Sequence, residues 1–370
     1  MRIGVDASRT TARWRTGTEG YSLNLIHELV RLGTGHQFRL YFNQAPPPGL
    51  FAAEGEQRII PFPRLWTHAR LSWEMLRQPP DVLFVPAHVL PLVHPRRSVA
   101  TIHDLGYYYY PAAHTRFQNL YLRWSTRYNA RHALRLVVDS EATCRDLIRL
   151  CGVPSAKIAV IYPGRDESLA PVTDPALLAG VRARHGLAER YLLTVGTLHP
   201  RKNLVRLVEA FAAAAREMQA APQLVLAGKK GWLYDDLFAR VRRLGLEEKV
   251  LFPGYVPPAE LPALLSGATA FLFPSLYEGF GFPVLEAMAC GTPVICSRAA
   301  SMPEVAGEAA LLVDPLDTAG LAEAICQVVG DEDLRSRLVE RGHQQVTCFS
   351  WSRCARQVLD VLEEVAGEAA

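Results

Sequence analysis

Short apolar runs alternate along the chain with segments in which apolar residues recur every three or four positions. Runs of the first kind predict buried β-strands, and segments of the second kind predict helices with one buried face. In the first half, the apolar runs lie at residues 2–6, 37–42, 57–61, 81–86, 98–104, 136–139 and 157–162. In the second half, they lie at residues 191–195, 224–227, 250–252, 268–274, 292–297 and 310–314. This alternation predicts an α/β fold in which each half of the chain builds its own sheet.

The length of the chain supports two domains. A chain of 370 residues is long for one hydrophobic core and suits two α/β domains. Residues 167–174, which include Pro171, have the composition of a linker. We therefore predict one domain over residues 1–168 and a second over residues 169–349, followed by a last helix that starts at residues 349–351 and runs to about residue 364.

Composition excludes several classes of protein. Hydrophobic residues make up 49% of the chain and charged residues 21%, which is typical of a soluble globular protein. The net charge of +3 is too small to indicate a nucleic-acid partner, and no apolar run reaches the roughly 18 residues of a membrane span. The chain enters a strand at once, which predicts no signal peptide. Seven scattered cysteines without zinc or redox spacing favour reduced thiols, so we expect a cytoplasmic protein.

The densest pattern of the chain lies at residues 275–293. Gly279 and Gly281 follow a buried strand and allow the backbone to turn tightly and to approach a ligand. Pro283 suits the first turn of a helix, and Gly291 ends that helix after about two turns. Such a loop brings free N–H groups and the positive end of a helix dipole together, which predicts an anion site, usually for phosphate.

Two carboxylates in this stretch need separate roles. Glu278 lies on the loop, whereas Glu286 lies about one turn inside the helix, so the two do not form a stacked pair. An acid beside a phosphate loop and another a turn deeper suit a ligand with hydroxyls at both ends of a diphosphate, such as a nucleotide sugar. The alternative is a structural strand, loop and helix with a capping acid.

These residues resemble a known family. Glu278 and Glu286, set in Glu-Gly-Phe-Gly-Phe-Pro-Val-Leu-Glu-Ala-Met-Ala-Cys-Gly-Thr-Pro-Val, are similar to the motif of the family-4 retaining glycosyltransferases, or glycosyl transferases group 1. The resemblance implies the GT-B fold, an α/β architecture of two facing Rossmann-like, doubly wound domains with a cleft between them. It also implies that the first domain lies on the acceptor side and is completed by the helix at residues 350–370. The second domain is then expected to bind a nucleotide-diphosphate sugar.

The resemblance extends to further donor-binding residues. Residues 196–203, Gly-Thr-Leu-His-Pro-Arg-Lys-Asn, closely resemble the diphosphate-binding segment of the family. Arg201 and Lys202 lie between a strand and a helix, where cations add to the N–H groups that face a diphosphate; two solvated basic residues are the alternative. The family uses the loop at residues 254–256 to hold the base. The expected donor-binding set is Gly196, Arg201, Lys202, Gly254, Tyr255, Val256, Glu278, Gly279, Phe280, Gly281, Phe282 and Glu286.

The first domain also carries polar residues at predicted strand ends, which is where open α/β sheets bind ligands. The resemblance implies that His103 reaches the transferred sugar; a structural hydrogen bond is the alternative. Residues 17–20 are predicted to form a glycine loop before a helix at residues 21–32, and a plain turn is the alternative. The residues expected to line the cleft on the acceptor side are Gly17, Gly20, Asp104 and Ser140.

Residues 106–138 contain no acidic side chain. In the predicted helix at residues 115–136, four arginines recur every four positions and make a basic stripe beside large aromatic residues. These arginines are Arg123, Arg127, Arg131 and Arg135. Anionic lipid headgroups or an anionic lipid-linked acceptor would favour such a face, which predicts peripheral contact with the inner face of a membrane. A solvated helix beside the sheet is the alternative.

Together these features predict a retaining glycosyltransferase that works without a metal. Arg201, Lys202 and the helix start near Phe282 stabilise the leaving diphosphate, while His103 and Glu278 orient the sugar. The resemblance implies front-face attack, in which the leaving phosphate takes the proton of the acceptor. The motifs, with Gly-Lys-Lys-Gly-Trp at residues 228–232, look most like those of bacterial mannosyltransferases of polysaccharide assembly. We therefore expect GDP-mannose as donor, a glycan or lipid-linked acceptor, and no cofactor.

Three other functions suit the same cleft. A sugar-nucleotide epimerase or a phosphorylase could use this fold. A phosphorylase is expected to carry a pyridoxal lysine, and no lysine lies in a recognisable site of that kind. A non-catalytic nucleotide-sugar-binding subunit could lose Lys202 or Glu278, and both are present.

Overall fold

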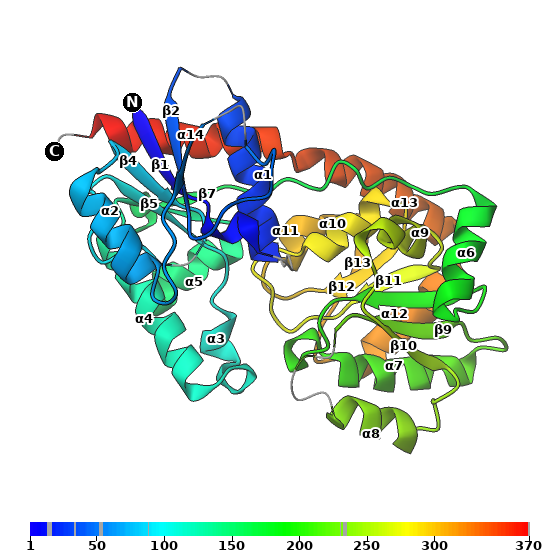
Figure 1. Ribbon diagram of the computed structural model, residues 1–370. Helices are drawn as coiled ribbons and strands as arrows, with labels where there is room; N and C mark the ends of the chain where they lie inside the picture. The colour runs from blue at the N-terminus through cyan, green and yellow to red at the C-terminus, as the bar shows by residue number, and fades with distance from the viewer. Residues whose placement is uncertain are drawn as a thin grey trace. The chain divides into compact units, whose positions relative to one another are not determined.

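The computed structural model describes residues 1–12, 17–32, 35–51, 55–87, 89–229, 231 and 235–368. It contains two compact units (Figure 1). Unit 1 comprises Met1–Gly164 and Phe349–Ala370, and unit 2 comprises Arg165–Cys348. The sequence analysis placed these two divisions after residues 168 and 349.

Unit 1 is built on a seven-stranded parallel sheet with the order β3-β2-β1-β4-β5-β6-β7. Its strands are β1 (Arg2–Asp6), β2 (Gln37–Phe42), β3 (Glu56–Ile59), β4 (Val82–Val85), β5 (Ser98–Ile102), β6 (Arg135–Val138) and β7 (Ile158–Val160). Its helices are α1 (Gly17–Arg31), α2 (Ser72–Arg77), α3 (Gly106–Tyr109), α4 (Arg116–His132), α5 (Glu141–Cys151) and α14 (Trp351–Gly367). Every residue of β4 and β5 is buried, as expected in the interior of a parallel sheet whose two faces are covered.

Unit 2 is built on a six-stranded parallel sheet with the order β10-β9-β8-β11-β12-β13. Its strands are β8 (Tyr191–Val195), β9 (Gln223–Ala227), β10 (Val250–Gly254), β11 (Ala270–Phe273), β12 (Val294–Ser297) and β13 (Ala310–Val313). Its helices are α6 (Pro175–His185), α7 (Leu204–Glu217), α8 (Asp235–Arg243), α9 (Leu261–Ser266), α10 (Phe282–Ala289), α11 (Met302–Ala306), α12 (Thr318–Gly330) and α13 (Glu332–Gln345). The predicted sheet of about six strands is therefore confirmed.

Both sheets reverse their strand order once, between β1 and β4 in unit 1 and between β8 and β11 in unit 2. This is the doubly wound arrangement, and it confirms the predicted α/β class with two Rossmann-like domains. In such sheets, ligands bind at the carboxyl ends of the strands beside the point of reversal. The loops that follow β8 and β11 are therefore expected to carry the ligand site of unit 2.

Helix α14 returns the chain to unit 1, where it packs against α1 (Figure 1). Its apolar face is buried, and the polar face carries Glu364, which accepts a hydrogen bond of 2.7 Å from Arg135 at the start of β6. Gly164 is packed directly against Trp351, because a Cβ at Gly164 would lie only 2.1 Å from the Trp351 nitrogen.

The predicted loop at residues 17–20 is wrong. Helix α1 begins at Gly17 and includes Gly20 in its first turn. Ser22 donates a hydrogen bond of 3.0 Å to the carbonyl oxygen of Thr18, and the charge of Glu19 is favourable near the positive end of the helix. These local interactions outweigh the weak helix propensity of the two glycines.

The predicted basic stripe is too long by one residue. Helix α4 ends at His132, and Arg135 is the first residue of β6. The next three residues of β6 are buried in the sheet, which fixes Arg135 in the strand. The stripe on α4 therefore consists of Arg123, Arg127 and Arg131.

Candidate active site

Three glycines hold the strand ends of unit 2 together beside the point where its strand order reverses. The nitrogen of Gly196 donates to the carbonyl oxygen of Ala227 at 2.9 Å, and the nitrogen of Gly228 donates to that of Gly254 at 2.7 Å. A Cβ on Gly228 would lie 1.8 Å from the carbonyl oxygen of Gly196, so no other residue fits. The ends of β8, β9 and β10 thus meet through backbone alone.

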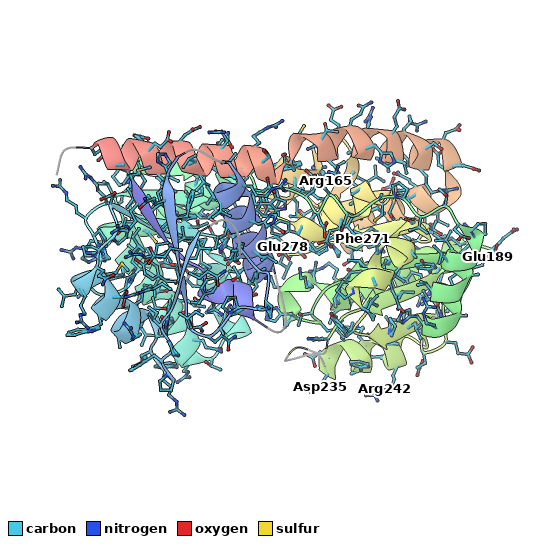
Figure 2. All side chains as sticks on the ribbon, turned by 45° about the horizontal axis from the view of Figure 1, so that its top comes forward. Arg165, Glu189, Asp235, Arg242, Phe271 and Glu278 are labelled. Carbon is cyan, nitrogen blue, oxygen red and sulfur yellow. The ribbon has the colours of Figure 1, made fainter. Side chains whose placement is uncertain are left out.

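Lys202 and Arg201, which follow β8, converge on Glu278, which follows β11 on the other side of the point where the strand order reverses. Lys202 ends the 3-10 turn Pro200–Lys202 after β8, and Glu278 lies in the loop after β11 (Figure 2). The Lys202 Nζ donates to Glu278 Oε1 at 2.8 Å, and the Arg201 Nη2 lies 3.7 Å from Glu278 Oε2. The nitrogen of Leu276 also donates to the carbonyl oxygen of Arg201 at 2.8 Å, so the backbone joins the two loops.

The Glu278 carboxyl is ionised in this environment. Burial would raise its pKa, but the charges of Lys202 and Arg201 hold the pKa below its ordinary value. The side chains of Glu278 and Lys202 are 11% and 17% exposed, so solvent screens the pair only weakly. Two cations held by one internal carboxylate can exchange that partner for a diphosphate.

The loop after β11 is fixed by a serine that the sequence analysis missed. The Ser301 hydroxyl is fully buried and lies 2.9 Å from the carbonyl oxygen of Glu278 and 2.5 Å from that of Phe280. Gly281 has a φ of 132°, and a Cβ there would lie 2.4 Å from the Met302 side chain. Pro303 and Glu304, which follow these two residues, are the signal that could have directed attention to this segment.

Glu286 lies in the second turn of α10, where it is half-buried. Burial, and to a smaller extent the charge of Asp166, raise its pKa to about 7, although Lys202 opposes the shift. Two acids in one stretch therefore have opposite behaviour: Glu278 is ionised, and Glu286 exchanges a proton near neutral pH.

The other predicted donor residues of unit 2 lie around this loop or at the end of β10. Gly279 is half-buried, and the rings of Phe280 and Phe282 form an edge-to-face pair with centroids 5.1 Å apart. Tyr255 is exposed beyond β10, and the Lys229 Nζ lies 4.9 Å from the centre of its ring. Val256 follows it and is half-buried. Within the predicted segment 228–232, Lys230 and Trp232 lie outside the described residues.

In unit 1, His103 is held by two oxygen acceptors. Its Nδ1 lies 2.6 Å from Asp139 Oδ2, and its Nε2 lies 3.0 Å from the carbonyl oxygen of Pro86. Both ring nitrogens then donate, which requires the imidazolium form. Burial would lower the pKa of His103, but the Asp139 carboxylate holds it above the ordinary value. Contact of His103 with a sugar stays a prediction, and it would need the bond to Pro86 to be released.

The remaining predicted residues of unit 1 have local structural partners. Asp104 accepts a hydrogen bond of 2.8 Å from the nitrogen of Gly106. Ser140 is fully buried and caps α5 by accepting from the nitrogen of Thr143 at 3.1 Å. Gly17 and Gly20 form the first turn of α1. Their roles on the acceptor side stay predictions.

Two further properties concern metals and membranes. Among the described residues, no group of three or more His, Cys, Asp or Glu side chains is arranged to hold a metal ion. None of the described helices combines the length and the apolar character that crossing a bilayer requires.

Two family models match the chain. "Glycosyl transferases group 1" matches residues 182–345, and "Glycosyltransferase Family 4" matches residues 15–169. Two doubly wound units with this cation cluster define a glycosyltransferase of the GT-B fold. The chain belongs to the family-4 glycosyltransferases, which confirms the predicted family, fold and enzyme class.

Known relatives cover nearly the whole chain. It is 31% identical over 364 residues to O-antigen chain mannosyltransferase B of Escherichia coli, a match that covers 93% of this chain and 95% of that protein. Sucrose-phosphate synthase from Thermosynechococcus elongatus superposes with a TM-score of 0.75 at 22% identity over 98% of both chains. HepE from Anabaena, solved in complex with UDP-glucose, has a TM-score of 0.75 at 19% identity over 98% of this chain and 99% of its own. At these identities, the two structures establish the fold.

Proposed function

We propose that this glycosyltransferase transfers mannose, with retention of configuration and without a metal, from GDP-mannose to a glycan or lipid-linked acceptor. The observation that carries the proposal is the convergence of Lys202 and Arg201 on Glu278 at the carboxyl edge of unit 2. Two cations beside the start of α10 suit a diphosphate leaving group, because helix N–H groups and cations stabilise the same charge.

The proposed reaction needs no nucleophile from the protein. The acceptor oxygen forms a bond to the anomeric carbon on the face from which the diphosphate oxygen leaves. The departing phosphate oxygen takes the acceptor proton, and Lys202 and Arg201 stabilise the charge that remains on the diphosphate. Glu278 and the backbone from Gly279 to Gly281 orient the sugar, and His103 is proposed to contact it from unit 1.

Glu286 is the proposed anchor of the ribose. A carboxylate accepts hydrogen bonds from two neighbouring hydroxyls, and Glu286 lies in the second turn of α10, deeper than the phosphate loop. The loop at residues 254–256 is proposed to hold the base through its backbone, since the φ of 79° at Gly254 turns the chain sharply after β10.

Mannose is favoured by similarity to O-antigen chain mannosyltransferase B over nearly the full length of both proteins. The name of that relative also favours a growing polysaccharide, free or lipid-linked, as the acceptor. The proposed setting is the cytoplasm, with the basic face of α4 in contact with anionic lipids at the inner membrane surface. The exposed side chains of Phe117 and Leu120 on α4 support that contact.

A donor panel tests the proposal. The protein is incubated with GDP-mannose, UDP-glucose and ADP-glucose, each with and without a mannan-type glycan acceptor, and products are followed by NMR. We expect transfer from GDP-mannose only when acceptor is present, with the anomeric configuration of the donor kept in the product. Epimerised donor without acceptor, or sugar phosphate released by inorganic phosphate, would instead favour an epimerase or a phosphorylase. A bound donor that is never consumed would favour a non-catalytic subunit.

A further inference from the structure

Unit 1 has a cavity on the edge of its sheet opposite to His103 and Asp139. Its volume is about 450 Å³, and its lining includes Arg96, Arg131, His132, Arg135 and Lys157. Arg96 precedes β5, Arg135 starts β6 and Lys157 precedes β7, so the cavity lies at the amino ends of these parallel strands. Ligands of the doubly wound fold bind at carboxyl ends, and this cavity is therefore separate from the proposed catalytic edge.

The charge of the cavity suits a dianion. Four of its lining residues are cations, namely Arg96, Arg131, Arg135 and Lys157. Arg135 donates to the carboxylates of Glu364 and Glu368, each at 2.7 Å. Because these two carboxylates neutralise two of the four cations, two positive charges remain at the cavity. A phosphate monoester, which carries a charge of about −1.5 to −2 at pH 7, matches this surplus.

The cations are held close together in spite of their mutual repulsion. The Lys157 Nζ donates to the carbonyl oxygens of Ala130 and Arg131 at 2.7 and 3.3 Å, which fixes it at the end of α4. Burial and the neighbouring Arg135 lower the pKa of Lys157. Within the described ranges, no ion pair joins Arg96 or Arg131 to a carboxylate, so both guanidinium groups are available to an anion.

A row of aromatic side chains leads along α4 to this cavity. Tyr121, Trp124, Tyr128 and His132 follow one another at helical spacing, with neighbouring ring centroids 5.7, 5.3 and 4.4 Å apart. His132 itself lines the cavity. On the same helix, Phe117 and Leu120 are 79% and 67% exposed. Aromatic and apolar side chains beside basic ones are characteristic of surfaces that lie in a bilayer interface.

Exposed apolar side chains continue beyond α4 in unit 1. The Tyr128 hydroxyl donates to the carbonyl oxygen of Leu92 at 3.3 Å, and Leu92 and Val93 are both exposed. The nitrogen of Val93 donates to the Ser72 hydroxyl at the start of α2, where the next residue, Trp73, is also exposed. An apolar surface thus adjoins the basic cavity.

We propose that the cavity binds the phosphate monoester of an anionic lipid headgroup while the aromatic row of α4 lies in the bilayer interface. The inference rests on the proposed membrane contact of α4 and adds a defined headgroup site to it. The surplus of two positive charges matches the phosphate, and the adjoining apolar surface identifies a lipid, and not a soluble metabolite, as its source.

Co-sedimentation with two kinds of vesicle tests this site. Phosphatidylcholine vesicles contain either phosphatidic acid, which presents a phosphate monoester, or phosphatidylserine, at contents that give equal surface charge. Arg96→Glu changes the cavity without touching α4, and Arg127→Glu, an equal charge change on α4, leaves the cavity intact. Both arginines are exposed, so both variants should fold. Glycerol 3-phosphate serves as a soluble competitor.

We expect the wild type to bind phosphatidic acid vesicles several-fold more tightly than phosphatidylserine vesicles, and glycerol 3-phosphate to remove this preference. Arg96→Glu should lose the preference, whereas Arg127→Glu should weaken binding to both vesicles alike and keep it. Equal effects of the two variants would overturn the site in favour of a diffuse basic surface. Binding of glycerol 3-phosphate without binding to either vesicle would overturn the lipid as its source.

The same proteins are assayed for transfer to a soluble acceptor, which neither variant should change. A wild type that fails to transfer any sugar but shows the vesicle preference would contradict the proposed function and leave the lipid site standing. Normal transfer with no preference for phosphatidic acid vesicles would contradict the lipid site and leave the proposed function standing.

Discussion

The pair formed by Lys202 and Glu278 is better explained by ligand exchange than by stability. A buried ion pair gains little net stability, because the cost of removing both charges from water offsets their attraction. Here the lysine also lies 4.3 Å from the centre of the Phe273 ring, so its position is fixed before any donor arrives. In the proposed function, the carboxylate keeps two cations in place for a diphosphate, with little reorganisation needed on binding.

Replacing Lys202 tests its proposed part in catalysis. Lys202→Ala should lower kcat/KM by about 10²–10³-fold, as loss of one group that stabilises transition-state charge does. The fold should survive, since Arg201 remains near Glu278. Steady-state kinetics and thermal unfolding check both statements, with Lys249→Ala, an exposed lysine before β10, as control. A loss of less than a few fold would contradict the diphosphate assignment.

Glu286 predicts a pH dependence of donor binding. With a pKa near 7, its carboxyl is protonated below that pH and ionised above it. Ribose hydroxyls donate to the ionised form, so KM for the donor should fall as the pH rises through about 7. Glu286→Gln should raise KM, remove this dependence and leave kcat nearly unchanged, because a ribose contact persists through the reaction. Collapse of kcat with KM intact would make Glu286 a chemical residue instead.

At the residue scale, the sequence predicted which residues belong to the candidate site better than it predicted the contacts that these residues make. Lys202, Arg201 and Glu278 were predicted to bind the donor from loops that follow strands, and the structure brings the three side chains together. Ser301 was missed because its partners are carbonyl oxygens more than twenty positions earlier in the chain. The two acceptors of His103 were missed because they depend on the register of three strands.

At the scale of single elements, the strand ends of unit 2 leave no room for side chains. Gly228→Ala should destabilise the protein by roughly 1–3 kcal/mol, because φ is 148° there and the new Cβ would meet the Gly196 backbone. Gly330→Ala is the control, since it lies at the end of α12 with nothing within 4 Å of the added atom. Thermal unfolding compares the two, and equal melting temperatures would refute the packing argument.

Helix α4 offers a second test at this scale. Arg116→Glu with Arg127→Glu reverses two exposed charges outside the basic cavity. If α4 contacts the membrane, each arginine near the surface contributes about 1 kcal/mol, so binding to acidic vesicles should weaken by on the order of tenfold or more. Transfer to a soluble acceptor should not change. Unaltered co-sedimentation, or none by the wild type, would favour a solvated helix.

The sequence predicted the bounds of a helix or strand correctly where a run of buried apolar residues sets those bounds. β8 was predicted at its observed bounds because an apolar run is bounded there by a loop with Gly196. Helix α6 was left without a prediction, although Asp174 caps it, Pro175 begins it and Gly186 ends it. The length of α4 was overestimated because arginine spacing continues past its end, and only the buried strand that follows shows where the helix stops.

At the scale of the whole molecule, the charges of unit 2 predict catalysis without a metal. The enzyme dialysed against a chelator should keep its transfer rate, because Arg201, Lys202 and the start of α10 supply the positive charge that a divalent ion supplies elsewhere. Initial rates before and after dialysis check this. A rate abolished by the chelator and restored by magnesium or manganese would contradict the assignment.

The path of the chain also sets an order for folding during synthesis. Unit 2 is continuous in sequence, whereas unit 1 is interrupted by it and needs α14 to cover its buried face. A growing chain can therefore complete the later unit while the earlier one still exposes apolar surface to the surroundings of the ribosome. By the same reasoning, a chain cut after Cys348 would keep the six-stranded sheet whole and leave the seven-stranded sheet prone to aggregation.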